Sequence, residues 1–276
     1  MQIPWKLKSF LFHVIDVVDG SRLLYFAQKN LTRRSRLEIF DTEKYWLFHK
    51  ANLEKLERPR VLEFGAGKNL AQNIFLNSTA RHQTVVDLFP MFDADLANTA
   101  AKAIEAKTAS AYFEISSVDD LSRYNISYIA PYDISQADFP DNSFDCCIST
   151  NTLEHIPRDS IIAIFTMMRR LLRNNGLISA AIDYSDHYSH TDRRIGPLEF
   201  LRYSDTEYYQ YNHKSHFQNR LRHRDFEGIF KDLGYVILLS EPLEMAEPPS
   251  YIAPAFDASI PTTFATRGLF LLRNEK

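Results

Sequence analysis

Residues 61–67 read Val-Leu-Glu-Phe-Gly-Ala-Gly, and this stretch decides the fold. Its apolar residues around one acid predict a buried strand, and the turn that follows leads into a helical period at Leu70, Ile74 and Phe75. Glycine lets the backbone turn sharply and approach a ligand, while a helix N-terminus offers free N–H groups to an anion. The chain has only 8 glycines, so two of them in one turn indicate a function. The stretch therefore predicts a cradle for a nucleotide-type cofactor at the end of a first strand.

The composition sets the class of protein. A length of 276 residues allows one large α/β domain with additions or two small domains, and 45% hydrophobic residues suffice for an apolar core. A net charge of −3 argues against a general nucleic-acid binder, so we expect no nucleic-acid partner. The only cysteines, Cys146 and Cys147, are neighbours and would point to opposite faces of a strand. We expect both to be reduced, as in a cytoplasmic protein.

The N-terminal part is basic. The first 40 residues hold seven Lys and Arg against three Asp and Glu. No secretory signal is evident, and no apolar run approaches the roughly 18 residues of a membrane span, which again favours a cytoplasmic location. The first helix is expected to carry an apolar side made of Leu7, Leu11, Val14, Ile15 and Val18. Its basic character fits weak association with an anionic membrane surface or a charged substrate, and the simpler interpretation is a solvated face on a packed helix.

The chain divides into a helical N-terminal extension, residues 1–57, and an α/β domain, residues 58–276. Helical crossovers between strands imply a doubly wound, mostly parallel sheet of seven strands. We expect strands at 61–64, 84–87, 126–134, 144–150, 177–182, 235–239 and 266–272, and helices at 93–107, 157–173 and 224–233. The block at about 184–223 departs from this alternation and is rich in tyrosine and histidine, so we expect a substrate lid inserted after the fifth strand.

Residues after the glycine turn narrow the choice of cofactor. A dinucleotide fingerprint needs a third small residue three positions after the second glycine, where this chain has Leu70. A Walker loop needs Ser or Thr after Gly-Lys, whereas Gly67 and Lys68 are followed by Asn69. The turn is therefore unsuited to NAD, FAD or a nucleoside triphosphate.

The stretch 61–67 resembles motif I of the class I S-adenosylmethionine-dependent methyltransferases, and later motifs resemble that family in the same order. Asp87 ends the second strand, and Tyr-Asp-Ile at 132–134 follows the third. Phe-Pro-Asp-Asn-Ser-Phe-Asp at 139–145 leads into the fourth strand, and Asn-Thr-Leu-Glu-His-Ile-Pro at 151–157 follows it. The resemblance implies the Rossmann-like methyltransferase fold, S-adenosylmethionine as the cofactor and S-adenosylhomocysteine as its product.

The resemblance also implies roles for single residues. Glu63 would balance the ammonium group of the methionine moiety, Asp87 would bind the ribose hydroxyls, and Asp133 would meet the adenine amino group. The implied cofactor-binding set is Glu63, Gly65, Ala66, Gly67, Asp87, Leu88, Asp133, Ile134 and Asn151. Each acid has a structural alternative: an ion pair with a lysine for Glu63, a helix N-cap for Asp87, and an Asx turn for Asp133.

Two histidines lie where the methyl acceptor is expected. His155 follows the fourth strand and His187 the fifth, at the edge where open α/β sheets bind ligands. A hydroxyl acceptor needs a general base or a metal because it holds its proton tightly. We expect His187 to be the base, oriented by Asp186 or Asp183; a pocket-shaping role is the alternative for His155 and a non-catalytic loop position for His187. The acids and histidines of this loop (Asp183, Asp186, His187, His190 and Asp192) match no fixed metal motif, and we assign no metal.

Residues 183–190, 200–204 and 219–222 resemble a subgroup of methyltransferases found with bacterial surface-polysaccharide biosynthesis. The expected function is therefore O-methylation of a sugar hydroxyl in a surface glycan, such as an O-antigen, or in its precursor. The alternatives are methyl transfer to a small-molecule metabolite and a protein of the same fold that binds without catalysis. An anionic acceptor would suit the basic residues of the lid, which are Arg193, Arg194, Arg202, Lys214, Arg220, Arg222 and Arg224.

Overall fold

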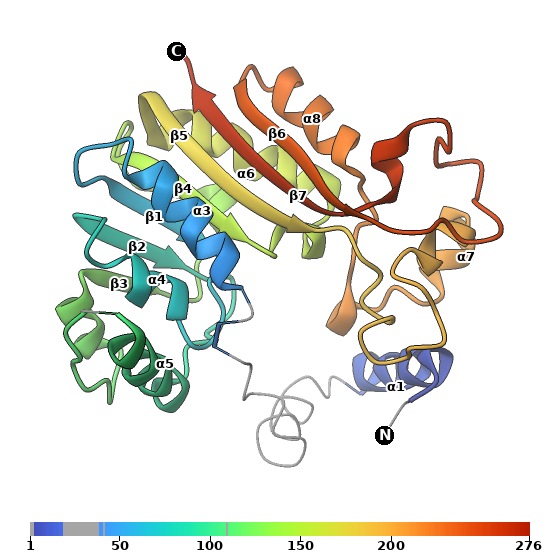
Figure 1. Ribbon diagram of the computed structural model, residues 1–276, viewed down its shortest axis with the longest axis horizontal. Coiled ribbons are helices and arrows are strands. Elements are labelled where there is room, and N and C mark those ends of the chain that lie inside the picture. The colour runs from blue at the N-terminus through green and yellow to red at the C-terminus, as the bar shows by residue number, and fades with distance from the viewer. Residues whose placement is uncertain (1–2, 19–38, 41, 109) are drawn as a thin grey trace.

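The computed structural model describes residues 3–18, 39, 40, 42–108 and 110–276. Its centre is one seven-stranded sheet in the order β3-β2-β1-β4-β5-β7-β6 (Figure 1). The strands are β1 (Arg60–Phe64), β2 (His82–Val86), β3 (Ile126–Ile129), β4 (Phe144–Thr150), β5 (Leu172–Asp183), β6 (Val236–Met245) and β7 (Ala265–Asn274). The first five strands pair in parallel, and β7 runs antiparallel to both β5 and β6. The predicted doubly wound, mostly parallel seven-stranded fold is confirmed.

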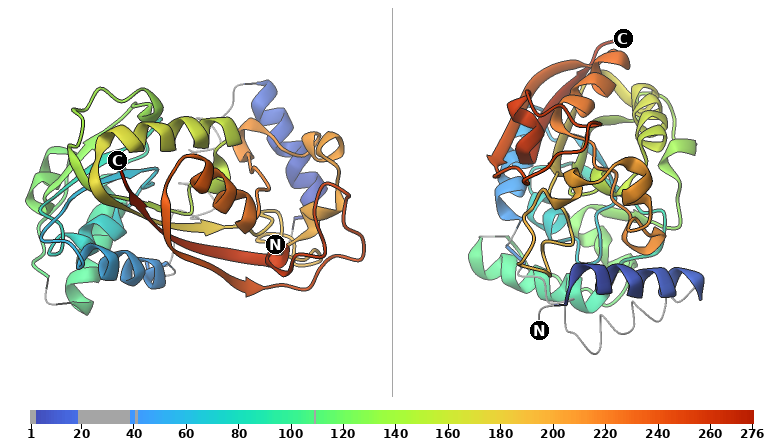
Figure 2. Two further views of the ribbon diagram at one scale, coloured as in Figure 1. Left: turned by 90° about the horizontal axis from the view of Figure 1, so that it is seen from above. Right: turned by 90° about the vertical axis from the view of Figure 1, so that its right-hand side faces the viewer.

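Helices cover both faces of this sheet (Figures 1 and 2). The α-helices in the described part of the chain are α1 (Trp5–Val17), α3 (Glu43–Leu53), α4 (Ala71–Leu76), α5 (Ala94–Lys107), α6 (Arg158–Leu171), α7 (Asp205–Tyr209) and α8 (His223–Asp232). Helices α3, α4 and α5 pack on one face, and α6 and α8 pack on the other. No helix in the described part of the chain is long and apolar enough to cross a membrane.

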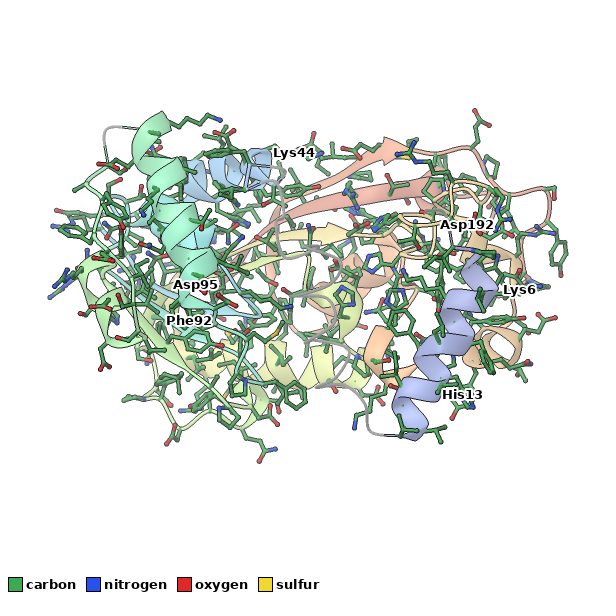
Figure 3. All side chains as sticks on the ribbon, turned by 90° about the horizontal axis from the view of Figure 1, so that it is seen from below. Lys6, His13, Lys44, Phe92, Asp95 and Asp192 are labelled. Carbon is green, nitrogen blue, oxygen red and sulfur yellow. The ribbon has the colours of Figure 1, made fainter. Side chains whose placement is uncertain are left out.

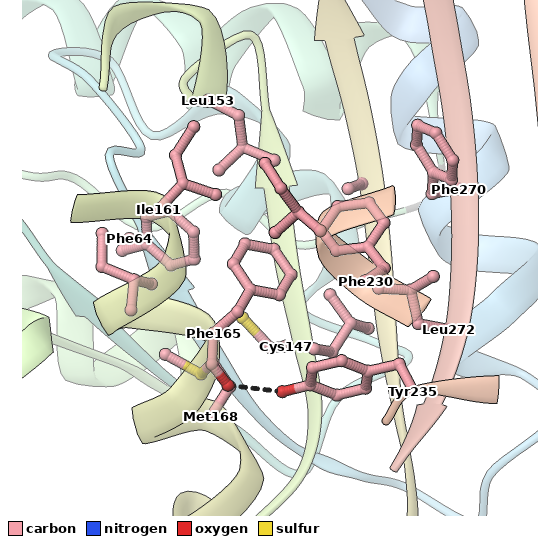
Figure 4. Close-up of a cluster of buried hydrophobic side chains, with 14 of the residues drawn as sticks. Phe64, Cys147, Leu153, Ile161, Phe165, Met168, Phe230, Tyr235, Phe270 and Leu272 are labelled. Carbon is pink, nitrogen blue, oxygen red and sulfur yellow. Dashed lines mark hydrogen bonds between the residues drawn. The ribbon is translucent and has the colours of Figure 1, made fainter. Parts of the chain in front are cut away.

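Alternate strand residues supply the two sides of the core, as the pleat of a strand requires. Val61 and Cys146 pack with α3 and α4, whereas Leu62 and Cys147 pack with α6 and α8. The two cysteines are buried and free on opposite faces, as predicted. Figure 4 shows the larger side, where the Tyr235 hydroxyl donates to a backbone carbonyl of α6 over 2.7 Å. Burying a tyrosine with its hydroxyl satisfied avoids the cost of an unpaired polar group.

Three strand boundaries differ from the prediction by five or six residues. The third strand ends at Ile129 and not at Ile134, because Pro131 follows and proline has no N–H for the ladder. The fifth strand begins at Leu172, five residues earlier than predicted, with an irregularity in its pairing to β4. The sixth strand continues to Met245, six residues beyond the predicted end, because it stays paired with β7.

Helix α1 is formed as predicted, but it buries a different side. Trp5, Ser9 and Phe12 are buried, whereas Leu7, Leu11, Val14 and Val18 are largely exposed. The aromatic side wins because it meets rings of the lid segment: Trp5 contacts Tyr188, Tyr203 and Tyr211, and Phe12 stacks on His216. Asp192 accepts the backbone N–H of Trp5 over 2.8 Å at the first turn of α1. Figure 3 labels Asp192 near the start of α1, and Lys6 and His13 on that helix. Of the predicted helical extension, residues 1, 2, 19–38 and 41 lie outside the described residues.

We expect Gly268→Ala to destabilise the protein. Gly268 lies in β7 opposite Ile182, and a Cβ atom there would stand 2.2 Å from the buried Tyr184 hydroxyl. Overpacking of this kind costs about 1–3 kcal/mol of unfolding free energy. The matched control is Gly228→Ala in α8, where a Cβ would meet nothing within 4 Å and should stabilise by about 0.5–1 kcal/mol. Chemical denaturation measures both, and equal effects would contradict the packing argument.

Candidate active site

The turn after β1 depends on two glycines in the left-handed region. Gly65 has φ +75° and Gly67 has φ +78°, which favour glycine over residues with a side chain. A Cβ on Gly65 would lie 2.3 Å from Cγ2 of Thr152, whose hydroxyl donates to the Gly65 carbonyl over 3.0 Å. A Cβ on Gly67 would meet no atom within 4 Å. The turn is therefore locked against the segment after β4 on one side and open on the other, as a cofactor cradle requires.

Glu63 lies in β1 directly before this turn and is fully buried. Its carboxylate accepts hydrogen bonds from the side-chain amides of Gln72, over 2.9 Å, and Asn73, over 2.5 Å, both in α4. No lysine pairs with it among the described contacts, so that alternative is not observed. Burial raises the pKa of Glu63 to about 8, and the two amide donors only partly oppose this shift. An ammonium group beside it would supply the missing positive charge.

A chain of buried hydrogen bonds leads to Glu63 from α3, on the same face of the sheet as α4. The Thr150 hydroxyl donates its only proton to the side-chain oxygen Oε1 of Gln72 over 2.8 Å. The same hydroxyl oxygen must therefore accept a hydrogen bond from Nε2 of His49, also at 2.8 Å. Nδ1 of His49 then accepts from the Ser179 hydroxyl. Burial lowers the pKa of His49 to about 3, which keeps the ring neutral and suits this one-donor, one-acceptor role. Each donor in the chain points toward Glu63.

Asp87 follows β2 and lies beside the same turn. It accepts a hydrogen bond from the Tyr128 hydroxyl over 2.8 Å, and the backbone N–H groups of Gly65 and Ala66 face it. Burial raises the pKa of Asp87 to about 6, while these donors lower it in part. Asp87 is not a helix N-cap; Asp93 caps α5 by accepting from the Leu96 N–H. The predicted role on the ribose hydroxyls stays a prediction that this position suits.

The remaining predicted cofactor residues lie along the same edge. Leu88 is 56% exposed beside Asp87, and its apolar side chain is available to cover a ring. Asp133 accepts hydrogen bonds from the backbone N–H and the hydroxyl of Ser135, so the Asx-type turn is present. These bonds, chiefly the one from the hydroxyl, lower the pKa of Asp133. Ile134 is buried behind it. Asn151 has φ +48° and a buried side-chain oxygen without a hydrogen-bond partner.

His155 and His187 are brought together. Their ring centroids lie 4.8 Å apart, and Nδ1 of His155 donates to the Phe217 carbonyl over 2.9 Å, which leaves its Nε2 free. Burial lowers the pKa of His155, so that ring is neutral near pH 7. Asp183 is the acid beside His187, with Oδ2 3.7 Å from Nε2. Asp186 instead accepts the Tyr188 backbone N–H over 2.8 Å, and burial raises the pKa of Asp186 to about 6.

Asp183 also pairs with Arg267 from β7. Burial alone would raise the pKa of Asp183, but the neighbouring His187 and the charge of Arg267 outweigh it and keep the carboxyl ionised. A fixed negative charge therefore lies beside the histidine pair.

Several basic residues of the lid contact other parts of the protein, and the anionic acceptor stays a prediction. Arg220 is buried and donates to the Phe200 and Tyr203 carbonyls. Arg222 is buried and donates to the carbonyls of Thr263 and Tyr184. Two more are paired with neighbouring acids, Arg194 with Asp192 and Arg202 with Glu199. A loop segment has carbonyls that no strand satisfies, and an arginine fork can serve several at once.

Comparison with known proteins settles the family. A family model described as a methyltransferase domain matches residues 26–239. The chain belongs to the class I S-adenosylmethionine-dependent methyltransferases. Its cofactor is S-adenosylmethionine, and the Gly65–Gly67 turn, Glu63 and Asp87 are the residues predicted to hold it. A search of curated proteins finds no match to this methyltransferase.

Solved structures agree on the fold of the methyltransferase. The 1,6-didemethyltoxoflavin-N1-methyltransferase of Burkholderia thailandensis, solved with 1,6-didemethyltoxoflavin and S-adenosylhomocysteine, is 14% identical with a TM-score of 0.51. That match covers 100% of this chain and 92% of the other. The PH0226 protein of Pyrococcus horikoshii OT3 is 14% identical with a TM-score of 0.50, covering 84% of this chain and 91% of the other. At such identities the likeness shows the fold alone.

Gly65→Ala is expected to abolish cofactor binding. The new methyl group would collide with Thr152 and would also occupy a strained backbone region, so the turn must open. Isothermal titration with S-adenosylhomocysteine should show at least a tenfold weaker affinity. Adding Thr152→Ala to this variant removes the Thr152 atoms nearest to the new methyl group and should restore part of the affinity. A double variant that binds S-adenosylhomocysteine as weakly as Gly65→Ala alone would contradict this cause.

The pH dependence of stability should depend on Glu63. Its pKa in the folded protein is about 8 against 4.5 ordinarily, so the folded state binds the extra proton and the unfolding free energy falls as pH rises from about 4.5 to 8. Glu63→Gln should flatten this fall, measured without cofactor by thermal unfolding at pH 5.5 and 8.5. Exposed Glu57→Gln is the control, and identical pH slopes in Glu63→Gln and the parent would refute the shift.

Proposed function

We propose that this methyltransferase transfers a methyl group to a hydroxyl of a sugar in a bacterial surface glycan or its precursor. The observation that carries the proposal is the close pair of His155 and His187 at the sheet edge that also holds the glycine turn. A hydroxyl gives up its proton reluctantly, so methyl transfer to it needs a proton acceptor at the reacting atom. The sugar assignment is supported by the resemblance of the lid segment to the polysaccharide subgroup.

The residues support the following chemistry. S-adenosylmethionine supplies a methyl group on a positively charged sulfur, so the main tasks left to the protein are alignment and removal of a proton. We propose that His187 takes the proton from the acceptor hydroxyl as the new C–O bond forms and the S–C bond breaks. The ionised Asp183, 3.7 Å away, would stabilise the imidazolium that results. Since Arg220 and Arg222 are engaged with backbone, the proposed acceptor need not be an anion.

We also propose that α1 rests on a membrane surface, where a lipid-linked sugar precursor would be found. Phe10 is 60% and Leu11 46% exposed on the outer side of this helix. Lys6 lies on the same short helix and would meet anionic headgroups. The area is small, so the association would be weak and reversible.

Replacement of His187 should remove catalysis and spare binding. With purified protein and radiolabelled S-adenosylmethionine, a panel of glycan, lipid-linked sugar, phenol and small-metabolite acceptors should show transfer to a sugar. His187→Gln should lower the rate by about 10²-fold or more, with unchanged S-adenosylhomocysteine affinity. Exposed His13→Gln is the control. Transfer only to phenols or metabolites would overturn the acceptor, and no transfer at all would favour a non-catalytic role.

Membrane association should depend on the outer side of α1. Phe10→Ser combined with Leu11→Ser should reduce cosedimentation with phosphatidylglycerol vesicles, because apolar area buried in the interface is lost. Leu47→Ser, which changes an exposed leucine on α3, is the matched control. Equal sedimentation of the double variant and the parent would contradict the proposal.

A further inference from the structure

Glu154 is the least satisfied side chain at the acceptor edge. It is 2% exposed, and neither carboxylate oxygen has a hydrogen-bond partner in the described structure. Backbone N–H groups of Glu154 and Asp183 face the carboxylate, but neither meets it with hydrogen-bond geometry. Arg267, the nearby cation, is paired with Asp183. A buried carboxyl group with no partner is costly, so its retention calls for a ligand.

The residues around Glu154 indicate which kind of ligand it binds. One ligand atom from each of Glu154, His155 and His187 lies within 4.8 Å of the other two. Glu154 and His155 come from the short helical turn after β4, and His187 comes from the loop after β5. We propose that these three side chains bind one divalent metal ion at the acceptor edge of the methyltransferase.

The hydrogen bonds of His155 and His187 suit metal binding, because each ring keeps one nitrogen without a hydrogen-bond partner. Nδ1 of His155 is fixed by the Phe217 carbonyl, which orients the ring and leaves Nε2 as the only lone-pair donor. Nε2 of His187 has no hydrogen-bond partner, and the backbone N–H of His187 is anchored by the Gln218 side chain over 3.2 Å. A carbonyl partner on the far nitrogen is the usual second contact of a metal-bound histidine.

The ligand set selects the kind of ion. Two imidazoles and one carboxylate suit Zn²⁺, Mn²⁺ or Fe²⁺, with open positions for water or substrate, whereas Mg²⁺ prefers oxygen ligands alone. Bonds of about 2.0–2.2 Å place neighbouring ligand atoms about 3.0–3.5 Å apart. The three ligand atoms must therefore draw together by about 1.3–1.8 Å from their present limit of 4.8 Å, a shift within the reach of side-chain rotation.

A bound ion would change the proposed reaction, and this part of the inference rests on the proposed hydroxyl acceptor. An acceptor oxygen in an open coordination position would become more acidic, as water does on Zn²⁺. The hydroxyl proton would pass to a solvent water as the C–O bond forms and the S–C bond of the cofactor breaks. His187 would then be a ligand of the ion, and no free histidine base would be needed.

Metal titration tests the site without any acceptor. Full-length protein, stripped with EDTA and desalted, would be titrated with ZnCl₂ by calorimetry and with CoCl₂ by visible absorption. We expect one site, and at least a tenfold loss of Zn²⁺ affinity in Glu154→Gln and in His155→Gln. Glu57→Gln and His13→Gln, both exposed, should bind as the parent does. Unchanged S-adenosylhomocysteine affinity would show that the Glu154 and His155 variants are folded.

The outcomes separate the two proposals. No Zn²⁺ or Co²⁺ binding by the parent, or parental binding by folded Glu154→Gln, would overturn the metal site and leave His187 as the base. Metal binding at this site without methylation of any sugar would overturn the acceptor and keep the site. Sugar methylation that is lost with EDTA, restored by Zn²⁺ or Mn²⁺, and not restored in Glu154→Gln would support both.

Discussion

The buried carboxyl group of Glu63 is the contact on which the rest of the site depends. It lies in β1, and the amides of Gln72 and Asn73 tie it to α4. Through Gln72 the same hydrogen bonds reach Thr150 in β4 and His49 in α3. Four elements are thus held in register around one acid, and the glycine turn begins two residues later. An acid that costs free energy to bury is kept where a cationic ligand can offset the cost.

Glu154 repeats this arrangement after the neighbouring strand β4. The chain reverses its winding between β1 and β4, which is where open α/β sheets bind their ligands. Glu63 has amide donors only, and Glu154 has no donor of good geometry. Both positions favour a positive partner: the ammonium of the cofactor at Glu63 and, in our proposal, a metal ion at Glu154.

The sequence predicts the parts of the site that are local. Gly65 and Gly67 are required by backbone angles, and the order of strands and motifs follows from periodicity and spacing. The partners of Glu63 were not predicted, because an amide at Gln72 or Asn73 acquires its role only when α4 folds back over β1. His49 was missed for the same reason, since its partners lie more than 100 residues away in the chain. The unpartnered carboxylate of Glu154 is likewise a tertiary property.

The side chains that surface elements bury were harder to predict from the sequence than the elements themselves. In α1 the aliphatic side was the better hydrophobic stripe, but Trp5 and Phe12 found aromatic partners in the lid segment and so decided which side is buried. Conversely, Arg220 and Arg222 have the charge of ligand-binding residues but serve the carbonyls of an irregular segment. Those arginines and α1 hold the lid segment, and within it His187 lies against His155. In the proposed reaction, the packing of the lid would therefore contribute more than its charge to the choice of acceptor.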